Sequence, residues 1–548
     1  EGLGSKTHYR PMVPVAIAPI AGRTGRRGLS TLRLRRSLRG NPRRSTLGLI
    51  VAAVGCVASL VGALQVSQHG SEQRRGTQLA NPAFVSASIG LTTKLPEPAA
   101  AEAAAVEDTP MPAQSQMSAP ATAANLAKSI VGPGVLVLPF AASQLVGEAQ
   151  AEGVEASVAI GGVTALFVFF CILNGLGFYL IGEVCSKTGA RTYQEAWTKT
   201  MGSDWAWMPS VASLICCLTG TIACASVIGD IASSFVAIGA PDLGIGREVL
   251  LSIISAAVLF PLCSLPSLKP LSGTSVLGIG GVCSLAAVMI ARCLDGSYLP
   301  QVHELEQVSA PQHTGGSLLG HCLIFLGVMS NAYSAHFNAP SLFNELEAPA
   351  KEPGAKLPEF GAVTCAGFGF SGLLFFAVTM AGMETFGAFT QPSVLNNYET
   401  GDPLMLVARM GLGLCVLFSF PLMERCFRNT AAELLELPAG KSNEPAIVAA
   451  SVALATLLAL VPGLGLDKVS AFGGALGASL LTYVAPALMV LKLREQNEHA
   501  ELKSNDRQRV QAFPSLALWE AGFLRSVAAL GSVLGGLGVA EAAGVQLG

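Results

Sequence analysis

The chain has 548 residues, of which 51% are hydrophobic and only 13% are charged. A soluble globular domain carries about 25% charged residues, so the composition excludes an ordinary soluble protein and indicates a polytopic membrane protein. The net charge of −2 discriminates nothing, because the charges are unevenly distributed. The 13 cysteines show no Cys-x-x-Cys or Cys/His ligand spacing. Most lie in apolar runs, where Cys acts as a small hydrophobe, so we expect no metal, disulfide framework or cofactor.

Residues 1–66 are a basic leader with an apolar run, interpreted as a targeting segment. The first 46 residues hold ten Arg and one Lys, and Glu1 is their only acid. This Arg-rich, acid-poor composition resembles an organelle transit peptide. A basic arm on an anionic membrane face is the alternative, and nucleic-acid binding ranks third. If the apolar run 47–66 crossed the membrane, it would conflict with the loop charges described below, so we expect it to be removed or not to span.

Residues 67–122 are rich in Ala, Pro, Ser and Glu, a composition that favours a disordered linker. A transmembrane domain is predicted over 123–541, because it contains eleven apolar stretches, each long enough for the ~20 residues that a helix needs to cross a bilayer. The predicted spans are 124–146, 157–182, 206–236, 249–267, 271–291, 317–342, 360–382, 403–423, 445–465, 469–491 and 519–541.

The loop charges predict the orientation of these spans. If the first span begins on the inner side, the inner loops hold fourteen Lys and Arg, whereas the outer loops hold only Arg247, Arg292 and Lys468. Inner loops of membrane proteins carry an excess of positive charge. The count therefore favours eleven spans with the N-terminal end of the domain inside.

No motif of a soluble enzyme is present, and we do not expect an enzyme. The glycine clusters 278–281 and 473–474 lie within predicted spans and match no phosphate-binding loop. Small residues in spans let helices approach closely. These glycines are therefore interpreted as packing contacts.

Two predicted spans, the first and the sixth, are interrupted by residues that disfavour a helix. The first contains Gly132-Pro133-Gly134, and the sixth contains Pro340 shortly after His336. Interrupted helices at matching positions of two halves are the best sequence indication of a transporter's binding site. An interruption frees backbone N–H and C=O groups, which are tolerated at membrane depth only where they line a cavity or meet a ligand.

Five separated motifs follow one another in the chain. The first reads Lys128-Ser-Ile-Val-Gly-Pro-Gly-Val-Leu-Val-Leu-Pro139, and the others lie at 189–193, 229–230, 335–346 and 396–421. Their sequences and order resemble the amino acid/auxin permease superfamily, which includes sodium-coupled neutral, proton-coupled and vacuolar amino acid transporters. The resemblance covers roughly 121–540. It implies an all-α, LeuT-like fold of two inverted five-helix repeats plus one helix, with helices 1 and 6 broken.

The resemblance also implies that the first interruption binds the substrate's carboxylate through freed N–H groups at a positive helix end. A kink used only for packing is the alternative. Pro133 departs from the small polar residue often found in relatives and removes one donor. The predicted substrate-binding residues are Val131, Gly132, Pro133, Gly134, His336, Phe337, Asn338 and Thr219, with Thr221 and Cys224 in the side-chain pocket.

Lys128, His336 and Ser419 are the candidate ion-coupling residues. The position of Lys128 is commonly Asn in sodium-coupled relatives and Lys in proton-coupled ones, so its ammonium would repel or replace Na⁺. The alternative is a lysine that extends to the membrane interface. His336 could relay a proton or cap freed backbone groups. Ser419 matches a hydroxyl of the relatives' sodium site or packs between helices.

These features predict a secondary active transporter that moves neutral amino acids by alternating access. H⁺ is the favoured coupling ion and Na⁺ the alternative. A transporter-like amino acid sensor and a non-transporting scaffold subunit are the competing classes. The expected partners are an amino acid substrate and the lipid bilayer, without nucleic acid, and the oligomeric state is left open. The expected location is an organelle membrane, plastid- or vacuole-like, with the plasma membrane as the alternative.

Overall fold

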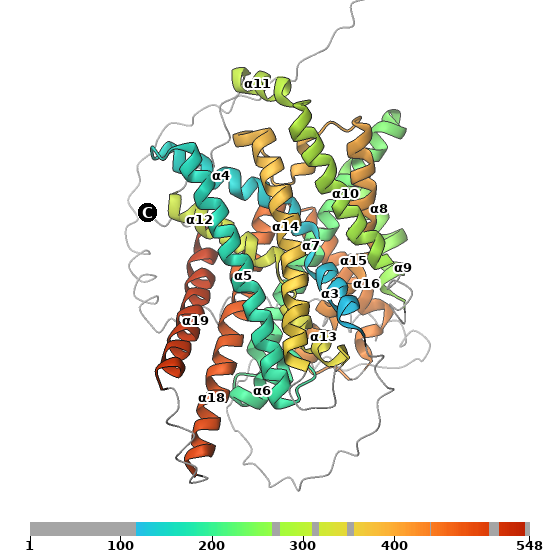
Figure 1. Cartoon of the computed structure of the whole chain (residues 1–548). Helices are drawn as coiled ribbons and strands as arrows, with labels where there is room; N and C mark the ends of the chain where they lie inside the picture. The colour runs from blue at the N-terminus through green and yellow to red at the C-terminus, as the bar shows by residue number, and fades with distance from the viewer. Residues whose placement is uncertain are drawn as a thin grey trace, which may run out of the picture. The chain divides into compact units, whose positions relative to one another are not determined.

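The computed structural model describes residues 117–265, 274–308, 317–347, 356–438, 440–503 and 514–542. The predicted leader, including 47–66, and the linker up to residue 116 lie outside this part. The chain divides into two units, Glu1–Ser59 and Leu60–Gly548, and all described residues belong to the second (Figure 1). The regular secondary structure of the described residues is helical, apart from one isolated bridge between Met117 and Leu346.

The first half of the described chain holds ten α-helices with short 3-10 or π segments between some of them. They are α3 (Ala119–Ile130), η2 (Pro133–Leu136), α4 (Leu138–Ala151), α5 (Ala156–Thr188), α6 (Tyr193–Met201), α7 (Trp207–Gly239), η3 (Pro241–Leu243), α8 (Arg247–Ile254), the π-helix η4 (Ser255–Leu259), α9 (Phe260–Cys263), α10 (Thr274–Asp295), α11 (Leu299–Val308) and α12 (Leu318–Ala332).

The second half begins at the sixth predicted span's interruption. Its elements are η6 (His336–Asn338), α13 (Ala339–Glu345), α14 (Lys356–Phe386), η7 (Gly387–Phe389), η8 (Val394–Asn397), α15 (Pro403–Leu434), η9 (Lys441–Asn443), α16 (Pro445–Ala459), α17 (Leu466–Phe472), the π-helices η10 (Gly473–Ala478) and η11 (Leu480–Val484), α18 (Ala485–Lys503) and α19 (Pro514–Ala542).

Every predicted span coincides with helical structure, which confirms the all-α polytopic class. Among the described residues, eight helices are long and apolar enough to cross a membrane, or nine if the bent α3–α4 pair is one span. The ninth predicted span holds only the shorter helix Pro445–Ala459, and the fourth is built from the short pieces α8, η4 and α9. The number of eleven spans and the inversion of the repeats therefore stay predictions.

Local sequence explains where several helices begin and end. α5 ends at Gly189, whose φ of 63° suits glycine. α6 begins with an N-cap similar to a capping box: the Thr192 hydroxyl accepts the Glu195 N–H at 3.1 Å, and the Glu195 carboxylate accepts the N–H of Arg191, the residue before the cap, at 2.7 Å. These residues lie within or next to the motif at 189–193, so that motif encodes the turn that separates α5 from α6.

Glycines bring helices into direct backbone contact, as predicted for both clusters. A Cβ on Gly281 of α10 would overlap the carbonyl oxygen of Gly411 on α15, and a Cβ on Gly474 of η10 would overlap that of Gly327 on α12. Only glycine permits this approach. The two contacts fix α10 against α15, and the π-helical tenth span against α12.

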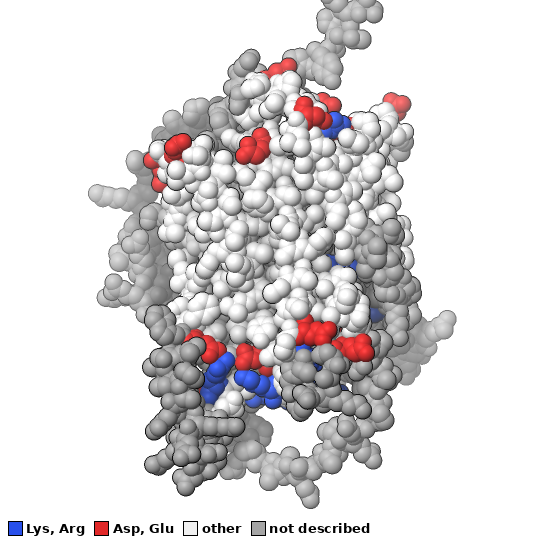
Figure 2. Space-filling model, viewed as in Figure 1, with Lys and Arg blue, Asp and Glu red and all other residues white. Residues whose placement is uncertain are grey.

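Charged side chains lie mainly at the two ends of the helices. On the face shown in Figure 2, Lys and Arg gather chiefly at the end formed by α6, α13 and α18 in Figure 1, and a broad band nearly free of charge separates it from the other end. This is the pattern expected of a membrane protein whose positive end faces inward. It agrees with the orientation predicted from the loops.

Polar contacts hold the predicted outer end together. Arg247 of α8 donates to Asp230 of α7 at 2.5 Å. The buried Arg409 of α15 donates to the carbonyl oxygens of Leu395, Tyr398 and Glu399, at 2.8 to 3.0 Å. Asp230 and Arg409 thus tie a neighbouring helix and the η8 loop in place.

Candidate substrate and ion site

The first interruption separates α3 from η2 and bends the span by 53°. The Val131 N–H still donates to Ala127 O at 2.8 Å, and Gly132 is fully extended, with φ −147° and ψ −163°. Among the described residues, none accepts a hydrogen bond from the Gly132 N–H. Pro133 has no N–H, and the N–H of Gly134 lies in the first turn of η2, where a helix has no internal acceptor. Two free donors thus stand at a positive helix end.

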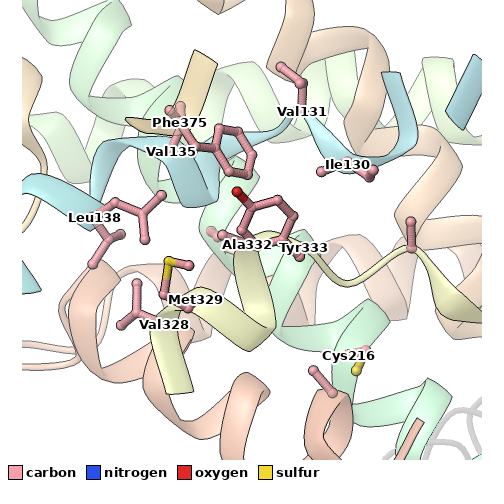
Figure 3. Packing of buried hydrophobic residues seen from close by; sticks show 14 of the residues in the cluster. Ile130, Val131, Val135, Leu138, Cys216, Val328, Met329, Ala332, Tyr333 and Phe375 are labelled. Atoms are coloured by element: carbon pink, nitrogen blue, oxygen red, sulfur yellow. The ribbon is translucent and has the colours of Figure 1, made fainter. Parts of the chain in front are cut away.

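The two glycines of this interruption have different surroundings. A Cβ on Gly132 would meet nothing within 4 Å, whereas one on Gly134 would lie 3.0 Å from the Cα and 3.2 Å from the Cβ of Ala332. Ala332 is the last residue of α12, so the two interrupted spans touch where their breaks begin. Figure 3 shows Val131 and Val135 on one side of this contact and Ala332 and Tyr333 on the other. Gly132 therefore faces open space, and Gly134 closes the contact.

The second interruption is a three-residue turn between α12 and η6. Tyr333, Ser334 and Ala335 donate to Met329 O, Asn331 O and Tyr333 O respectively, at 2.9 to 3.1 Å. The fully buried ring of Tyr333 lies 5.1 Å from that of Phe375 on α14, between centroids. By length and composition, Leu318–Glu345 counts as a single span. The sixth span is thus interrupted, but it is not divided into a strongly bent pair.

His336 is fully buried and uses both ring nitrogens. Nε2 lies 2.9 Å from the carbonyl oxygen of Asn174 on α5, and Nδ1 lies 3.2 Å from the hydroxyl of Thr482 on η11. A carbonyl only accepts, so Nε2 carries the hydrogen and Nδ1 accepts from the hydroxyl. The ring thereby joins the second interruption to α5 and η11, an arrangement that favours the capping interpretation over a proton relay.

A buried polar network extends from this histidine, and sequence reasoning missed it. The Asn174 amide donates to the Tyr483 hydroxyl at 3.0 Å, and that hydroxyl lies 2.9 Å from the hydroxyl of Ser330 on α12. Asn174 is a single polar side chain in an apolar run, whereas Ser330 precedes Asn331 and Tyr483 follows Thr482. Polar residues inside predicted spans are the only sequence signal, and they do not identify the partners.

Lys128 lies in the last turn of α3 and is half-buried. Its ammonium lies close to Cys415 on α15. One turn further along α15, the Ser419 hydroxyl donates to the Cys415 carbonyl at 2.8 Å. The predicted ion-coupling residues Lys128 and Ser419 therefore both lie near Cys415 of α15, whereas His336 lies in another region.

Thr219 of α7 lies close to the second interruption, because Thr219 and Asn331 of α12 both approach Gly473. A Cβ on Gly473 would overlap the Thr219 hydroxyl and lie 2.6 Å from the Asn331 side-chain oxygen. Thr219 already donates to the carbonyls of Ile215 and Cys216, so only its lone pairs remain to meet a ligand. Asn331 was not among the predicted site residues.

The other predicted substrate residues are placed as follows. Phe337 and Asn338 are half-buried in η6, and Thr221 and Cys224 are buried on α7.

Comparison with known proteins identifies the class. The family model described as "Transmembrane amino acid transporter protein" matches residues 115–508. This chain therefore belongs to that family of membrane transporters, as its motifs predicted, and it is not an enzyme. Its substrates are amino acids.

Particular relatives are similar at low identity. Amino acid transporter AVT6E of Arabidopsis thaliana is 24% identical over 398 residues, covering 68% of this chain and 76% of its own. Sodium-coupled neutral amino acid transporter 7 of Homo sapiens is 25% identical over 393 residues, covering 67% and 78%. A solved manganese transporter mutant of Eremococcus coleocola aligns with a TM-score of 0.42 at 12% identity, over 78% of this chain and 96% of its own; this likeness defines neither fold nor substrate here.

Proposed function

We propose that this protein is a secondary active transporter that moves neutral amino acids by alternating access, driven by H⁺. The observation that supports it most is the first interruption, where free N–H groups next to an open space lie against the end of α12. The substrate carboxylate meets the backbone at residues 131–134, as helix ends bind anions. The substrate ammonium meets the carbonyl groups freed at the end of α12, and the two halves rock about this site.

The side chains around the site support neutral substrates. Thr219, Asn331 and Ser334 offer uncharged polar groups; Ser334 donates to the Cys216 thiol at 3.6 Å. Lys128 is the charged side chain nearest the first interruption in the sequence, one turn before Gly132. An acidic or basic substrate side chain would need a counter-charge to offset its desolvation. Neutral amino acids need none.

Lys128 supports H⁺ rather than Na⁺ coupling. Its ammonium stands beside the α15 stretch that includes Ser419, where sodium-coupled relatives are expected to hold their ion. A fixed positive charge repels a second cation bound nearby. The human relative is named as a sodium-coupled transporter, so the flux experiment compares the two ions directly.

The leader and the relatives support a location in an organelle membrane. The Arg-rich residues 1–66 support an organelle membrane, and a yeast relative is named vacuolar amino acid transporter 7. Deletion of 1–66 should relocalise the protein in cells and leave reconstituted transport intact. Loss of transport in a folded truncated protein would show that 47–66 belongs to the transport domain.

The deciding experiment is flux into proteoliposomes. The purified protein is tested with a panel of labelled amino acids, first under a pH gradient and then under a Na⁺ gradient. Uptake of neutral amino acids with the pH gradient supports the proposal. Binding without flux would indicate a sensor, and neither binding nor flux would indicate a scaffold subunit. Uptake that needs Na⁺ would show that the proposed coupling ion is wrong.

A further inference from the structure

Besides Lys128 and His336, the domain holds a buried pair of ionisable residues outside the proposed substrate site. Glu424 and Arg428, one turn apart on α15, are 0% and 2% exposed. Arg428 Nε lies 3.1 Å from Glu424 Oε1. Ionisable residues buried in membrane spans are costly and by default indicate function. The predicted span ended at residue 423, so sequence reasoning assigned Arg428 to a loop and did not consider Glu424.

The hydrogen bonds of this pair are incomplete. Glu424 Oε1 accepts the Ser451 hydroxyl of α16 at 2.5 Å, whereas Glu424 Oε2 has no partner among the described residues. Arg428 Nη1 donates to Ser442 O at 2.6 Å and lies 3.3 Å from Asn443 Oδ1, while Nε and Nη2 make no hydrogen bond of proper geometry. The guanidinium is therefore held by the η9 turn as well as by the carboxylate.

The other end of the same helix carries a complete ion pair. Asp402, the cap of α15, accepts two hydrogen bonds from Arg292 at 2.7 and 2.8 Å and one from Tyr298 at 2.8 Å. Burial raises the pKa of Asp402, but the hydrogen bonds from Arg292 and Tyr298 outweigh it and hold the pKa at about 2. A fully satisfied pair stays charged and serves structure. Glu424 lacks that support.

The remaining neighbours of Glu424 are the groups that surround a proton bound to its carboxylate. Arg425 on the same helix adds positive charge and donates to Leu265 O at 2.6 Å. Cys263 of α9 places its thiol beside the carboxylate, and α16 contributes the uncharged Ser451. Glu424 is the single acid among these neighbours in the described chain.

We infer that Glu424 binds and releases the coupling proton, and that Arg428 shifts from Glu424 to the Ser442–Asn443 turn when the carboxylate is protonated. The inference rests on the proposed proton-driven transport. Protonation at the free Oε2 removes a buried charge whose partner is otherwise held, so the exchange leaves no guanidinium without an acceptor. The proton comes from water on one side and leaves to water on the other as the transporter alternates.

The position of Glu424 on α15 connects it to the substrate site. It follows Ser419 by five residues, about 7.5 Å along a helix at 1.5 Å per residue. Pro421 lies between them within α15, and proline removes one hydrogen bond of the helix ladder. This stretch can therefore change shape locally, and a change next to Lys128 and Ser419 can reach Glu424.

The test compares two kinds of flux by the full-length protein in proteoliposomes. Gradient-driven accumulation of labelled amino acid needs the proton, whereas exchange of labelled for unlabelled amino acid at equal pH does not. In Glu424→Gln we expect accumulation to fall at least tenfold while exchange persists, and internal acidification during uptake, followed with a pH-sensitive dye, to disappear. Accumulation and acidification like the wild type would overturn the inference.

Two further variants keep the test decisive. Glu424→Gln leaves Arg428 without its counter-charge and could fail to fold; the double variant Glu424→Gln/Arg428→Met removes both charges and should exchange without accumulating. Accumulation by the folded double variant would overturn the inference. Glu183→Gln is the matched control, because Glu183 also lies at the predicted inner end and pairs with Lys187 at 2.6 Å; it should accumulate normally. A wild type that exchanges no amino acid would overturn the proposed function itself.

Discussion

The two interruptions differ in how their polar groups are satisfied. At the first, no described residue accepts a hydrogen bond from the Gly132 N–H, the Gly134 N–H lies in the first turn of η2, and the space in front of Gly132 is open. At the second, His336 is fully buried with both ring nitrogens bonded. Free backbone groups at membrane depth need a ligand, whereas the two ring nitrogens of His336 already have protein partners.

This difference suggests that the two interruptions have different roles. The first is suited to bind the substrate carboxylate through its free N–H groups. At the second, His336 is suited to anchor the end of α12, whose carbonyl groups we propose to meet the substrate ammonium. The bridge at the ends of the two spans supports this view: Met117 donates to Glu345 O at 2.8 Å, and Glu347 donates to Met117 O at 2.9 Å. The breaks are therefore coupled in position and distinct in chemistry.

The largest effect is expected where the two breaks touch. In Gly134→Leu the Cβ alone would lie 3.0 Å from Ala332 Cα, so the spans must separate. We expect transport below detection and a stability loss of about 1–3 kcal/mol, typical of overpacking. Proteoliposome flux and thermal unfolding measure both. Gly280→Ala is the control, because a Cβ there meets nothing within 4 Å. Normal flux in Gly134→Leu would show that the contact is not needed.

A smaller effect on transport is expected at the second break, where the loss should fall on stability rather than on binding. His336→Leu leaves the Asn174 carbonyl and the Thr482 hydroxyl without this partner, which should cost about 3 kcal/mol of unfolding free energy. Thr482→Val removes one of the two bonds and should cost about 1 kcal/mol. Substrate affinity and the pH dependence of uptake should persist in the folded protein. A stable His336→Leu protein that has lost its pH dependence would instead establish a proton relay.

Gly132 should show the opposite behaviour. Its extended backbone suits any residue, and a side chain meets open space, so Gly132→Val should fold with stability within about 0.5 kcal/mol of the wild type. The valine would occupy the space that the substrate needs, and we expect the apparent Kd to rise about tenfold, or about 1.4 kcal/mol. Equilibrium binding and thermal unfolding on one preparation separate the two quantities. Unchanged affinity would move the binding site elsewhere.

The sequence was informative about the first break and much less about the second. Gly132-Pro133-Gly134 disrupts a helix by its own backbone chemistry, so no distant residue is needed to recognise it. The role of His336 depends on Asn174 and Thr482, which lie 162 and 146 residues away in the chain. Glu424 was missed for a related reason: the apolar pattern ends at 423, and its burial comes from α9 and α16. A sequence therefore indicates the backbone preference of neighbouring residues, but it does not identify the partners that the fold brings to a side chain.

The smallest effect concerns the residue that precedes the first break by one turn. Lys128→Asn removes a positive charge close to Cys415 and adds a side-chain oxygen. Asn is the residue that the resemblance to sodium-coupled transporters leads us to expect at a position that helps to hold Na⁺. Because the repulsion of Na⁺ disappears, we expect uptake by the variant to rise a few-fold when choline is replaced by Na⁺, while the wild type is indifferent to this replacement. Lys128→Met, which removes the charge without adding an oxygen, is the matched control and should show no Na⁺ response. A wild type that already requires Na⁺ would show that Lys128 does not stand in for the ion.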